Sequence, residues 1–348
     1  MCFLSVCIPS FNRSHLLVPL FESILAQNFS DYEIVLAEDC SPEQKDIGAF
    51  ADEFKASCSV SFTYVENKSN LGYDANLRNL ISLAKGEYVI FLGNDDLLAP
   101  GALSAIHEAL SSQSNVGVLL RSYSSFLSSP DDVIQTFRYF NEDRVFSPGP
   151  ETIITFFRRC VFISGMVFRR SIAHNLSTNE FDGTLLYQQY LVGRILESYS
   201  GYYLHQVISY HRLGGVPDFG SSNSEKGLHT PRQQTLASSV HFMEGMLRIA
   251  KSLDPYNHQI SRDITKDIGN YSYPILSIQS HLPPKKFIGY IRSLAQLGLW
   301  VSPYFLLYGL ALIFFGKARC DWFISKIKLL LGRSPKLGKF SSGTPLRK

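Results

Sequence analysis

The chain has 348 residues, of which 45% are hydrophobic and 18% are charged, and its formal net charge is +3. This composition excludes an intrinsically disordered protein and leaves room for one large domain or two ordinary ones. The charge is uneven, because residues 317–348 hold nine Lys or Arg and one Asp (net +8), whereas residues 1–316 hold 24 positive and 29 negative side chains (net −5). A mildly acidic body with a basic tail indicates that the tail contacts an anionic surface.

Strand and helix patterns alternate through the first 120 residues. Strands are predicted at residues 3–8, 32–37, 60–65 and 88–92, and helices at 15–26, 42–56 and 74–84, with another beginning near Pro100. This alternation is typical of βαβ units and a mainly parallel sheet, which binds ligands at the carboxyl ends of its strands. All four ends are polar and are predicted to lie along one rim: residues 9–13, 38–41, 66–70 and 93–96.

The rest of the chain is less regular. A strand is predicted at residues 164–168, a helix at 185–197 and mostly helical structure over 232–295. Residues 214–227 are rich in Gly, Ser, Asn and Pro, which predicts a flexible loop. Such a loop either closes over a ligand and excludes water or serves as a disordered linker.

Residues 293–316 contain no charged side chain and would be long enough to cross a bilayer as one helix. Pro303 is expected to interrupt that helix and to leave twelve apolar-rich residues, about 18 Å at ~1.5 Å per residue. Basic residues on both sides favour keeping both flanks cytoplasmic. We therefore expect a re-entrant or in-plane membrane helix beside a basic tail on anionic lipid, with a buried helix of the globular body as the alternative.

The six cysteines are scattered, without a C-x-x-C pair or a His/Cys cluster of zinc spacing, which predicts reduced thiols in a cytoplasmic protein. The short apolar run at the N-terminus has no basic region ahead of it and ends at Pro9. It therefore predicts a first strand rather than a signal peptide.

Two adjacent carboxylates, Asp95 and Asp96, follow the apolar run Tyr88–Leu92 after only Gly93 and Asn94. Mg²⁺ and Mn²⁺ prefer oxygen ligands and often lie between carboxylates and a substrate diphosphate. The acidic pair therefore predicts a cation site, and a polar turn that caps the next helix is the alternative.

Four elements in order resemble the inverting family 2 glycosyltransferases: Ile8–Arg13, Glu38–Ser41, Asn70–Asn79 and Gly93–Asp96. The resemblance implies the A-type glycosyltransferase fold, a Rossmann-like, mainly parallel α/β sheet flanked by helices. It covers the first 120 residues well and the chain to about residue 212 loosely. The membrane-proximal character of the C-terminal third resembles bacterial members that build lipopolysaccharide O-antigen or other surface polysaccharide on a lipid carrier.

The resemblance divides the chain into a nucleotide-sugar-binding half (1–120), an acceptor-binding half (121–230) and a helical C-terminal extension (231–348) with a membrane-associating segment at about 296–316. It implies a nucleoside-diphosphate-sugar donor, a lipid-linked saccharide acceptor, a Mg²⁺ or Mn²⁺ cofactor and a peripheral position on the cytoplasmic face of the cell membrane. The implied donor-binding residues are Pro9, Phe11, Asn12, Arg13, Glu38, Asp39, Asn70, Arg78, Asn94 and Asp95.

Within this set, Glu38 and Asp39 would accept hydrogen bonds from the base and ribose, unless they cap the following helix. Arg78 would reach the base or a phosphate, unless it is a surface helix arginine. Asp95 matches the second acid of the family's D-x-D motif, whose first acid is replaced by Gly93. Asp96 would support the loop or bind sugar or metal, and one carboxylate with the diphosphate and waters can still hold Mg²⁺.

His211 precedes the 214–227 loop, about where A-type enzymes can place a late metal ligand. It is a candidate metal ligand, and a packed or surface histidine is the alternative.

Inverting transfer needs a base for the acceptor hydroxyl, which the family takes from a Glu-Asp pair opening a helix. Here Phe181-Asp182-Gly183 resembles the preceding turn, but the helix carries Gln188 and Gln189, and glutamine is no base. Asp182 is therefore the candidate base, with a turn or helix-cap residue as the alternative.

Other classes fit less well. Residues 9–13 contain no glycine, which disfavours a nucleotidyltransferase phosphate loop, and the absence of G-x-G-x-x-G disfavours a dinucleotide oxidoreductase. Nucleic acid binding is not expected, because the basic residues cluster beside the apolar segment. A catalytically impaired, membrane-bound sugar-nucleotide binding module stays open, since Gly93 and Gln188 stand where acids are expected.

Overall fold

The computed structural model describes residues 2–254 and 259–330, with side chains up to Lys326. The basic tail predicted from the sequence therefore lies outside the described residues from residue 331 on. The chain divides into two compact units, the first ending at Gln233 and the second beginning at Gln234.

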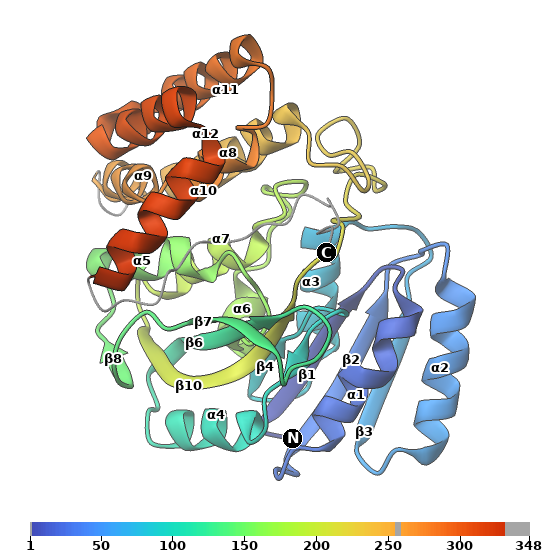
Figure 1. The fold of residues 1–348 in the computed structure, drawn as a ribbon. Helices are drawn as coiled ribbons and strands as arrows, with labels where there is room; N and C mark the ends of the chain where they lie inside the picture. The colour runs from blue at the N-terminus through green and yellow to red at the C-terminus, as the bar shows by residue number, and fades with distance from the viewer. Residues whose placement is uncertain (1, 255–258, 331–348) are drawn as a thin grey trace. The chain divides into compact units, whose positions relative to one another are not determined.

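The described residues of the first unit form a ten-stranded sheet in the order β3-β2-β1-β4-β9-β6-β10-β5, with β7 paired to β6 and β8 to β10 (Figure 1). The strands are β1 (Leu4–Ser10), β2 (Tyr32–Glu38), β3 (Ser61–Glu66), β4 (Tyr88–Phe91), β5 (Leu97–Leu98), β6 (Val116–Phe126), β7 (Val133–Phe137), β8 (Arg144–Phe146), β9 (Val167–Arg169) and β10 (Ser200–Arg212).

The part β3-β2-β1-β4 is parallel, as the sequence predicts. The strands β1, β2 and β3 end level, because Ser10 pairs with Glu38 and Glu38 with Glu66, whereas β4 ends at Phe91, which pairs with Cys7. The rest of the sheet is mixed, so the prediction of a mainly parallel sheet holds only for this part. The reason is the route of the chain: Gly165 N–H bonds to the carbonyl of Phe91, so β9 starts at the carboxyl end of β4 and runs back antiparallel to it.

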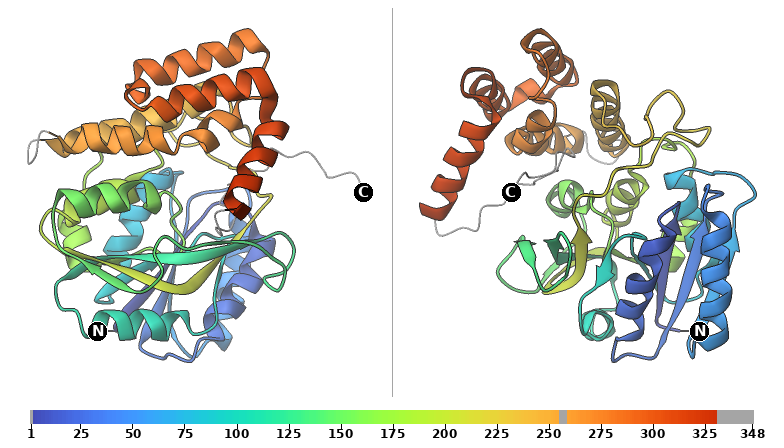
Figure 2. Two further views of the ribbon diagram at one scale, coloured as in Figure 1. Left: turned by 60° about the vertical axis from the view of Figure 1, so that its left-hand side comes forward. Right: turned by 45° about the vertical axis from the view of Figure 1, so that its right-hand side comes forward.

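Helices cover both faces of the sheet (Figure 2). Val6 and Ile8 of β1 face a core cluster that includes Leu20 and Phe21, while Cys7 faces the carbonyl of Leu80 on α3. The helices of this unit are α1 (Leu17–Leu25), α2 (Gln44–Ser57), α3 (Tyr73–Leu83), α4 (Ala102–Ser111), α5 (Pro150–Phe157), α6 (Arg170–Asn175) and α7 (Tyr187–Ile195).

The second predicted helix begins later than the sequence suggests. We expect it from Pro42, but α2 begins at Gln44. Cys40 has a left-handed φ of 54°, and Glu43 accepts from the N–H and hydroxyl of Ser14 at 2.8 and 2.7 Å. The turn after β2 therefore serves tertiary contacts before the helix starts.

The second unit is helical, as predicted for residues 232–295. Its helices are α8 (Leu236–Ser252), α9 (Ile260–Asn270), α10 (Tyr273–Ile278), α11 (Pro284–Gln296) and α12 (Pro303–Leu330). Its core includes Ile249, Ile264, Leu276, Leu294 and Phe305.

Pro303 ends the preceding segment and opens α12, which confirms the predicted interruption. A second break follows at Gly316, whose φ of 71° and ψ of 165° are not helical. Across residues 2–254 and 259–330, no helix is both long and apolar enough to cross a membrane. The helix buries Phe305 and Leu312. It exposes a row of large apolar side chains: Tyr304, Leu306, Leu307, Leu310, Phe314, Phe315, Trp322 and Phe323. The alternative, a helix fully buried in the globular body, is therefore wrong.

Candidate functional site

The carboxyl end of β1 is tied to the loop that follows β4. Pro9 is the last residue but one of β1, and Phe11 follows the strand. The side-chain amide of Asn94 donates to the carbonyl oxygen of Asn12 at 2.9 Å and to that of Phe11 at 3.5 Å. Asn94 is buried, so the first and fourth predicted elements meet at this contact.

Arg13 extends from the same turn to the acidic pair. Asn12 and Arg13 have left-handed φ angles of 55° and 65°, which side-chain-bearing residues seldom adopt outside functional turns. The Arg13 guanidinium donates to Asp95 Oδ2 at 2.7 Å and to Asn94 Oδ1 at 3.4 Å. The side chains of Arg13 and Asp95 are 25% and 17% exposed, so the ion pair is largely shielded from solvent.

Asp39 connects the end of β2 to the turn before α3. Its Oδ1 accepts from the N–H of Leu71 (2.8 Å) and from Asn67 (2.9 Å), and its Oδ2 accepts from the N–H of Gly72 (2.9 Å). Gly72 has a φ of 87°, which favours glycine, and Asn70 Oδ1 accepts from the same N–H. Burial raises the pKa of Asp39, although these donors favour its charged form.

Glu38 is fully buried beside Asp39. Its Oε1 accepts from the N–H of Ser41 at 2.9 Å, but its Oε2 has no hydrogen-bond partner in the described part of the chain. Burial raises the pKa of this carboxyl group. A buried oxygen without a partner costs free energy, which makes Oε2 a candidate acceptor for a ligand N–H or hydroxyl. Because α2 begins only at Gln44, neither Glu38 nor Asp39 caps it.

Arg78 on α3 forms a two-pronged ion pair with Asp182, in which Nη2 lies 2.7 Å from Oδ2. Its guanidinium also lies 5.4 Å from the centre of the Tyr187 ring. Burial opposes the charge, but the hydrogen bonds to Asp182 outweigh it and raise the pKa of Arg78. Arg78 is therefore not the free surface arginine of the alternative.

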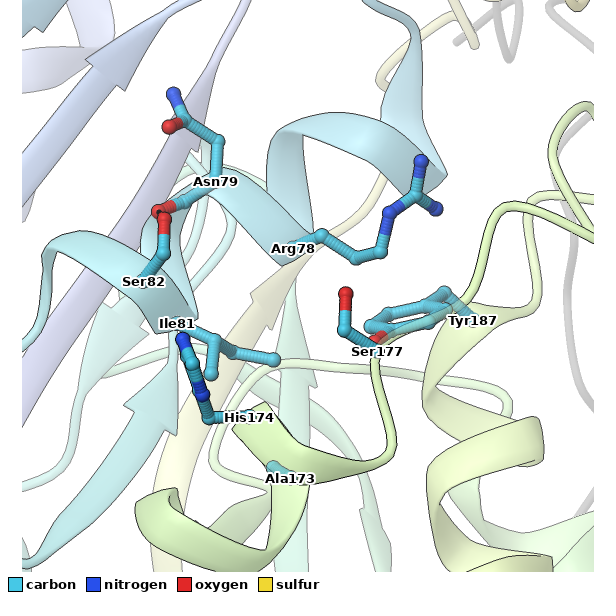
Figure 3. Close-up of a pocket in the computed structure, with 8 residues that line it drawn as sticks. All are labelled: Arg78, Asn79, Ile81, Ser82, Ala173, His174, Ser177 and Tyr187. Carbon is cyan, nitrogen blue, oxygen red and sulfur yellow. Dashed lines mark hydrogen bonds between the residues drawn. The ribbon is translucent and has the colours of Figure 1, made fainter.

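A cavity of about 200 Å³ lies beside this ion pair. Figure 3 shows Arg78 extending from α3 toward Tyr187 and Ser177. The cavity lining is mostly polar: Arg78, Asn79, Ile81, Ser82, Ala173, His174, Ser177 and Tyr187.

The loop after β4 is fixed by Asp96. Its Oδ1 accepts from His211 Nδ1 (3.1 Å) and from the N–H of Arg212 (3.0 Å), and its Oδ2 accepts from the Ser164 hydroxyl (2.5 Å). A Cβ added at Gly93 would lie 3.1 Å from Asp96 Oδ2 and 3.3 Å from both Asp95 Oδ1 and Ser164 Oγ. The missing first acid therefore has little room, because the Asp96 network occupies its place.

Asp95 and His211 could together bind a metal ion that also contacts a bound ligand. Burial and the neighbouring Asp96 raise the pKa of Asp95, against the effects of Arg13 and His211. Burial lowers the pKa of His211, but its contact with Asp96 outweighs this and raises it. Because Nδ1 donates to Asp96, the neutral ring offers Nε2 as the ligand nitrogen. Among the described residues, no three His, Cys, Asp or Glu side chains are arranged as a complete metal site.

Arg121 supports the segment whose Ser164 contacts Asp96, and sequence reasoning did not single it out. It is fully buried in β6, and its guanidinium donates to the carbonyls of Ser164 (2.8 Å) and Phe162 (2.5 Å). The rings of Tyr123 and Phe162 lie 4.8 and 5.0 Å from it. Burial lowers the pKa of Arg121. The available signal was a charged residue directly after the apolar run Val116–Leu120.

Residues 213–233, here termed the strap, run along the rim. Arg13 Nη2 donates to the carbonyl of Val216 (2.9 Å), and Asn12 donates to Asp218 Oδ2 (2.7 Å). Buried Glu225 accepts from the N–H of Tyr73, at the start of α3, at 2.8 Å. The strap is thus bound to two of the four elements, and the disordered-linker alternative is wrong.

Comparison with known proteins identifies the first unit. Residues 5–174 match the family model for glycosyl transferase family 2. This part of the chain belongs to family 2. The family 2 match extends past β9 into α6 and thus includes all four rim elements.

The curated relatives align with about a third of this chain. One is the GalNAc(5)-diNAcBac-PP-undecaprenol beta-1,3-glucosyltransferase of Campylobacter jejuni, 34% identical over 103 residues, which are 30% of this chain and 33% of that protein. Several others are also named as bacterial glycosyltransferases, one of them for colanic acid biosynthesis. The aligned region spans about a third of the length of these relatives.

Two solved structures resemble the whole chain. TarS residues 1–349 of S. aureus in complex with UDP-GlcNAc has a TM-score of 0.60, with 15% identity, and the match covers 99% of this chain and 98% of that one. A mannosyltransferase from Pyrobaculum calidifontis in complex with GDP-Man and Mn²⁺ has a TM-score of 0.50, with 14% identity, and covers 91% and 88%. These likenesses confirm the predicted A-type glycosyltransferase fold.

Gln188 and Gln189, at the position where the base was expected from the sequence, make structural contacts. Gln188 and Gln189 are buried and donate to the carbonyls of Val161 (2.9 Å) and Phe157 (2.8 Å). Both oxygens of Asp182 accept from Arg78, so it could take a proton only at the expense of that ion pair.

Asp74, which sequence reasoning missed, fixes the same turn. It is buried in the first turn of α3 and accepts from the N–H groups of Gly183 (3.0 Å), Leu185 (2.9 Å) and Tyr187 (2.9 Å). Burial raises its pKa to about 7. Its place one residue after Gly72-Tyr73 gave no signal, because its partners lie more than 100 residues away.

Proposed function

We propose that the chain is a glycosyltransferase that transfers a sugar from a nucleoside diphosphate sugar to a lipid-linked saccharide at the cytoplasmic face of a bacterial membrane, in surface polysaccharide or O-antigen assembly. The observation that carries this proposal is the union of the four rim elements. Asn94 joins the first to the fourth, and Asp39 joins the second to the third, within a family 2 domain.

The donor would lie along this rim. Pro9, Phe11 and Asn12 would line the nucleotide, and buried Glu38 Oε2 would accept from the base or ribose. Arg13 and Asn94, beside Asp95, would bind the diphosphate and the sugar. Asn70 and Asp39 would hold the turn before α3 in place beneath the nucleotide.

A divalent cation fits the chemistry of the remaining donors. Asp95 and His211 would hold it, and Asp96 would orient His211 by accepting from Nδ1. When bound, the cation neutralises negative charge on the departing nucleoside diphosphate. Two protein ligands with phosphate and water are a common arrangement for Mg²⁺.

On the acceptor side, the acceptor oxygen would bond to the anomeric carbon as the bond to the diphosphate breaks, and its proton would go to a base. We propose Asp182 for this role, with release from Arg78 when the acceptor binds. If Asp182 instead only fixes Arg78, then Asp182→Asn will raise KM and leave most of kcat, whereas loss of the base would reduce kcat.

A lipid-linked acceptor would bring the second unit to a membrane surface. Phe314 and Phe315 are 73% and 60% exposed, and Lys317 and Arg319 follow after Gly316. Exposed aromatic side chains beside cationic ones are typical of segments that lie in a bilayer interface. The name of the Campylobacter relative, which includes an undecaprenyl-linked saccharide, also supports this acceptor class.

The test is release of nucleoside diphosphate from a panel of UDP-, GDP- and dTDP-sugars, with Mg²⁺, with Mn²⁺ and in excess chelator. We expect turnover that needs a cation, and a loss on the order of 100-fold in Asp95→Asn, because several kcal/mol of stabilisation at the leaving group are removed. Asp46→Asn, the same substitution at an exposed position on α2, is the matched control. Full activity in chelator would remove Asp95 and His211 from metal binding.

The buried glutamines favour a second candidate, a sugar-nucleotide binding module without turnover. Equilibrium binding of UDP or GDP by a wild-type protein that releases no diphosphate from any donor would establish this module and reject the enzyme.

A further inference from the structure

Arg13 connects the loop that carries Asp95 and Asp96, here termed the corner, to the strap. Its Nη1 lies 2.7 Å from Asp95 Oδ2, and its Nη2 lies 2.9 Å from the carbonyl oxygen of Val216. A planar guanidinium can make two such contacts at once, whereas an ammonium group is a single point charge. The corner and the strap are therefore coupled through one residue.

Arg13 occupies Oδ2 of Asp95, one of the two carboxylate oxygens that a cation could use. With Gly93 in place of the first acid and both oxygens of Asp96 engaged, Asp95 is the carboxylate of this loop that remains for a metal. Its Oδ2 already faces a positive charge at 2.7 Å. A metal that takes Asp95 Oδ2 must displace this guanidinium.

The strap is held on the same side by a contact that does not touch the corner. Asn12 donates to Asp218 Oδ2 at 2.7 Å. Gly215 lies close to the corner as well, because a Cβ at this position would be 3.2 Å from Asp95 Oδ2. A movement of the strap away from the rim would therefore also change the surroundings of Asp95.

We infer that Arg13 is a switch residue: it neutralises Asp95 and holds the strap along the rim until a divalent cation displaces it, after which the strap is released and the guanidinium is available to a diphosphate. This inference rests on the proposed function for its meaning, but not for its test. The chain thereby avoids an uncompensated carboxylate at the rim in the absence of donor.

The experiment measures binding of Mn²⁺ alone, by electron paramagnetic resonance, and hydrogen exchange of residues 213–233. Removing the competing charge in Arg13→Gln should tighten Mn²⁺ binding about tenfold, which corresponds to ~1.4 kcal/mol. In the absence of metal, the strap amides of Arg13→Gln should exchange about tenfold faster than those of wild type. In wild type, Mn²⁺ should speed strap exchange, and in Arg13→Gln it should add little.

Two variants separate the parts of the switch. Asp218→Ala, which removes the acceptor for Asn12, should speed strap exchange and leave Mn²⁺ affinity unchanged. Arg13→Lys should keep most of the competition with Mn²⁺ but lose strap protection. Arg169→Gln on β9, which breaks an ion pair between Arg169 and Glu87, is the control for losing an arginine. Weaker Mn²⁺ binding in Arg13→Gln, or strap exchange that Mn²⁺ leaves unchanged in wild type, would overturn the inference. Neither readout needs turnover, so failure of the proposed function would be seen separately.

Discussion

Asp74→Asn tests whether burial or hydrogen bonding decides the charge of the carboxyl group that binds the N–H groups of Gly183, Leu185 and Tyr187. Three backbone N–H groups favour the carboxylate, but burial prevails and raises the pKa of Asp74 to about 7. The unfolded chain has a value near 3.9, so between about pH 4 and pH 7 the folded state binds a proton that the unfolded state has lost. Stability conferred by Asp74 is therefore complete below pH 4 and falls as pH rises to 7.

The magnitude follows from the interval. Each pH unit changes the free energy of unfolding by ~1.4 kcal/mol, which gives about 4 kcal/mol as an upper limit over three units. Asparagine cannot ionise and offers one oxygen to three N–H groups, so the variant should be less stable at pH 4.5 by about 2 kcal/mol. This difference should shrink, and then reverse, as pH approaches 7.5.

The assay is urea unfolding of wild type and Asp74→Asn at pH 4.5, 5.5, 6.5 and 7.5, followed by tyrosine and tryptophan fluorescence. Asp132→Asn, at an exposed position, is the control for removing an acid. Parallel stability curves for wild type and Asp74→Asn would show that Asp74 is ionised throughout, and that the three N–H donors outweigh burial.

Two further changes test the strap and the exposed face of α12. Gly183→Ala should destabilise the chain by about 1 kcal/mol for its φ of 85° and by ~1–3 kcal/mol more because the new Cβ would lie 2.2 Å from the carbonyl oxygen of Ser224. Gly214→Ala, with a φ of 88° and no described atom within 4 Å, should cost only the first amount, so equal melting temperatures for the two variants would contradict the packing of the strap. Phe314→Ser with Phe315→Ser should weaken binding to phosphatidylglycerol vesicles by more than about tenfold, since each buried aromatic contributes roughly 1.5–3 kcal/mol. Leu127→Ser in the first unit is the matched control, and unchanged vesicle binding would reject the membrane face.

The sequence predicted the rim because its signals are local. Each polar element follows an apolar strand at once, and parallel strands bring such ends to one edge whatever the details of packing. Asn12, Asp39 and Asn94 could therefore be named from the order of residues alone. Glu43, by contrast, bonds to Ser14 rather than opening α2 with Pro42, and a contact over 29 positions leaves no local pattern.

The residues missed are those whose partners are distant in the chain. Asp74 bonds to Gly183, Leu185 and Tyr187, and Glu225 bonds to the start of α3. The contact of Arg13 with the carbonyl of Val216 was also not predicted, because Val216 lies 203 positions away. Such contacts depend on which loops the sheet brings together.

By itself, the sequence determined the α/β class, the four strand ends with their polar residues, the break at Pro303 and the absence of the first acid at Gly93. Local periodicity and turn chemistry suffice for these features. Only the tertiary structure decided that β9 runs antiparallel, that Asp96 is an anchor for His211 and Ser164, and that Arg13 pairs with Asp95 beneath the strap. The physical reason is that a buried charge takes whichever partner the fold supplies, and the partners here lie 68 to 115 residues apart in the chain.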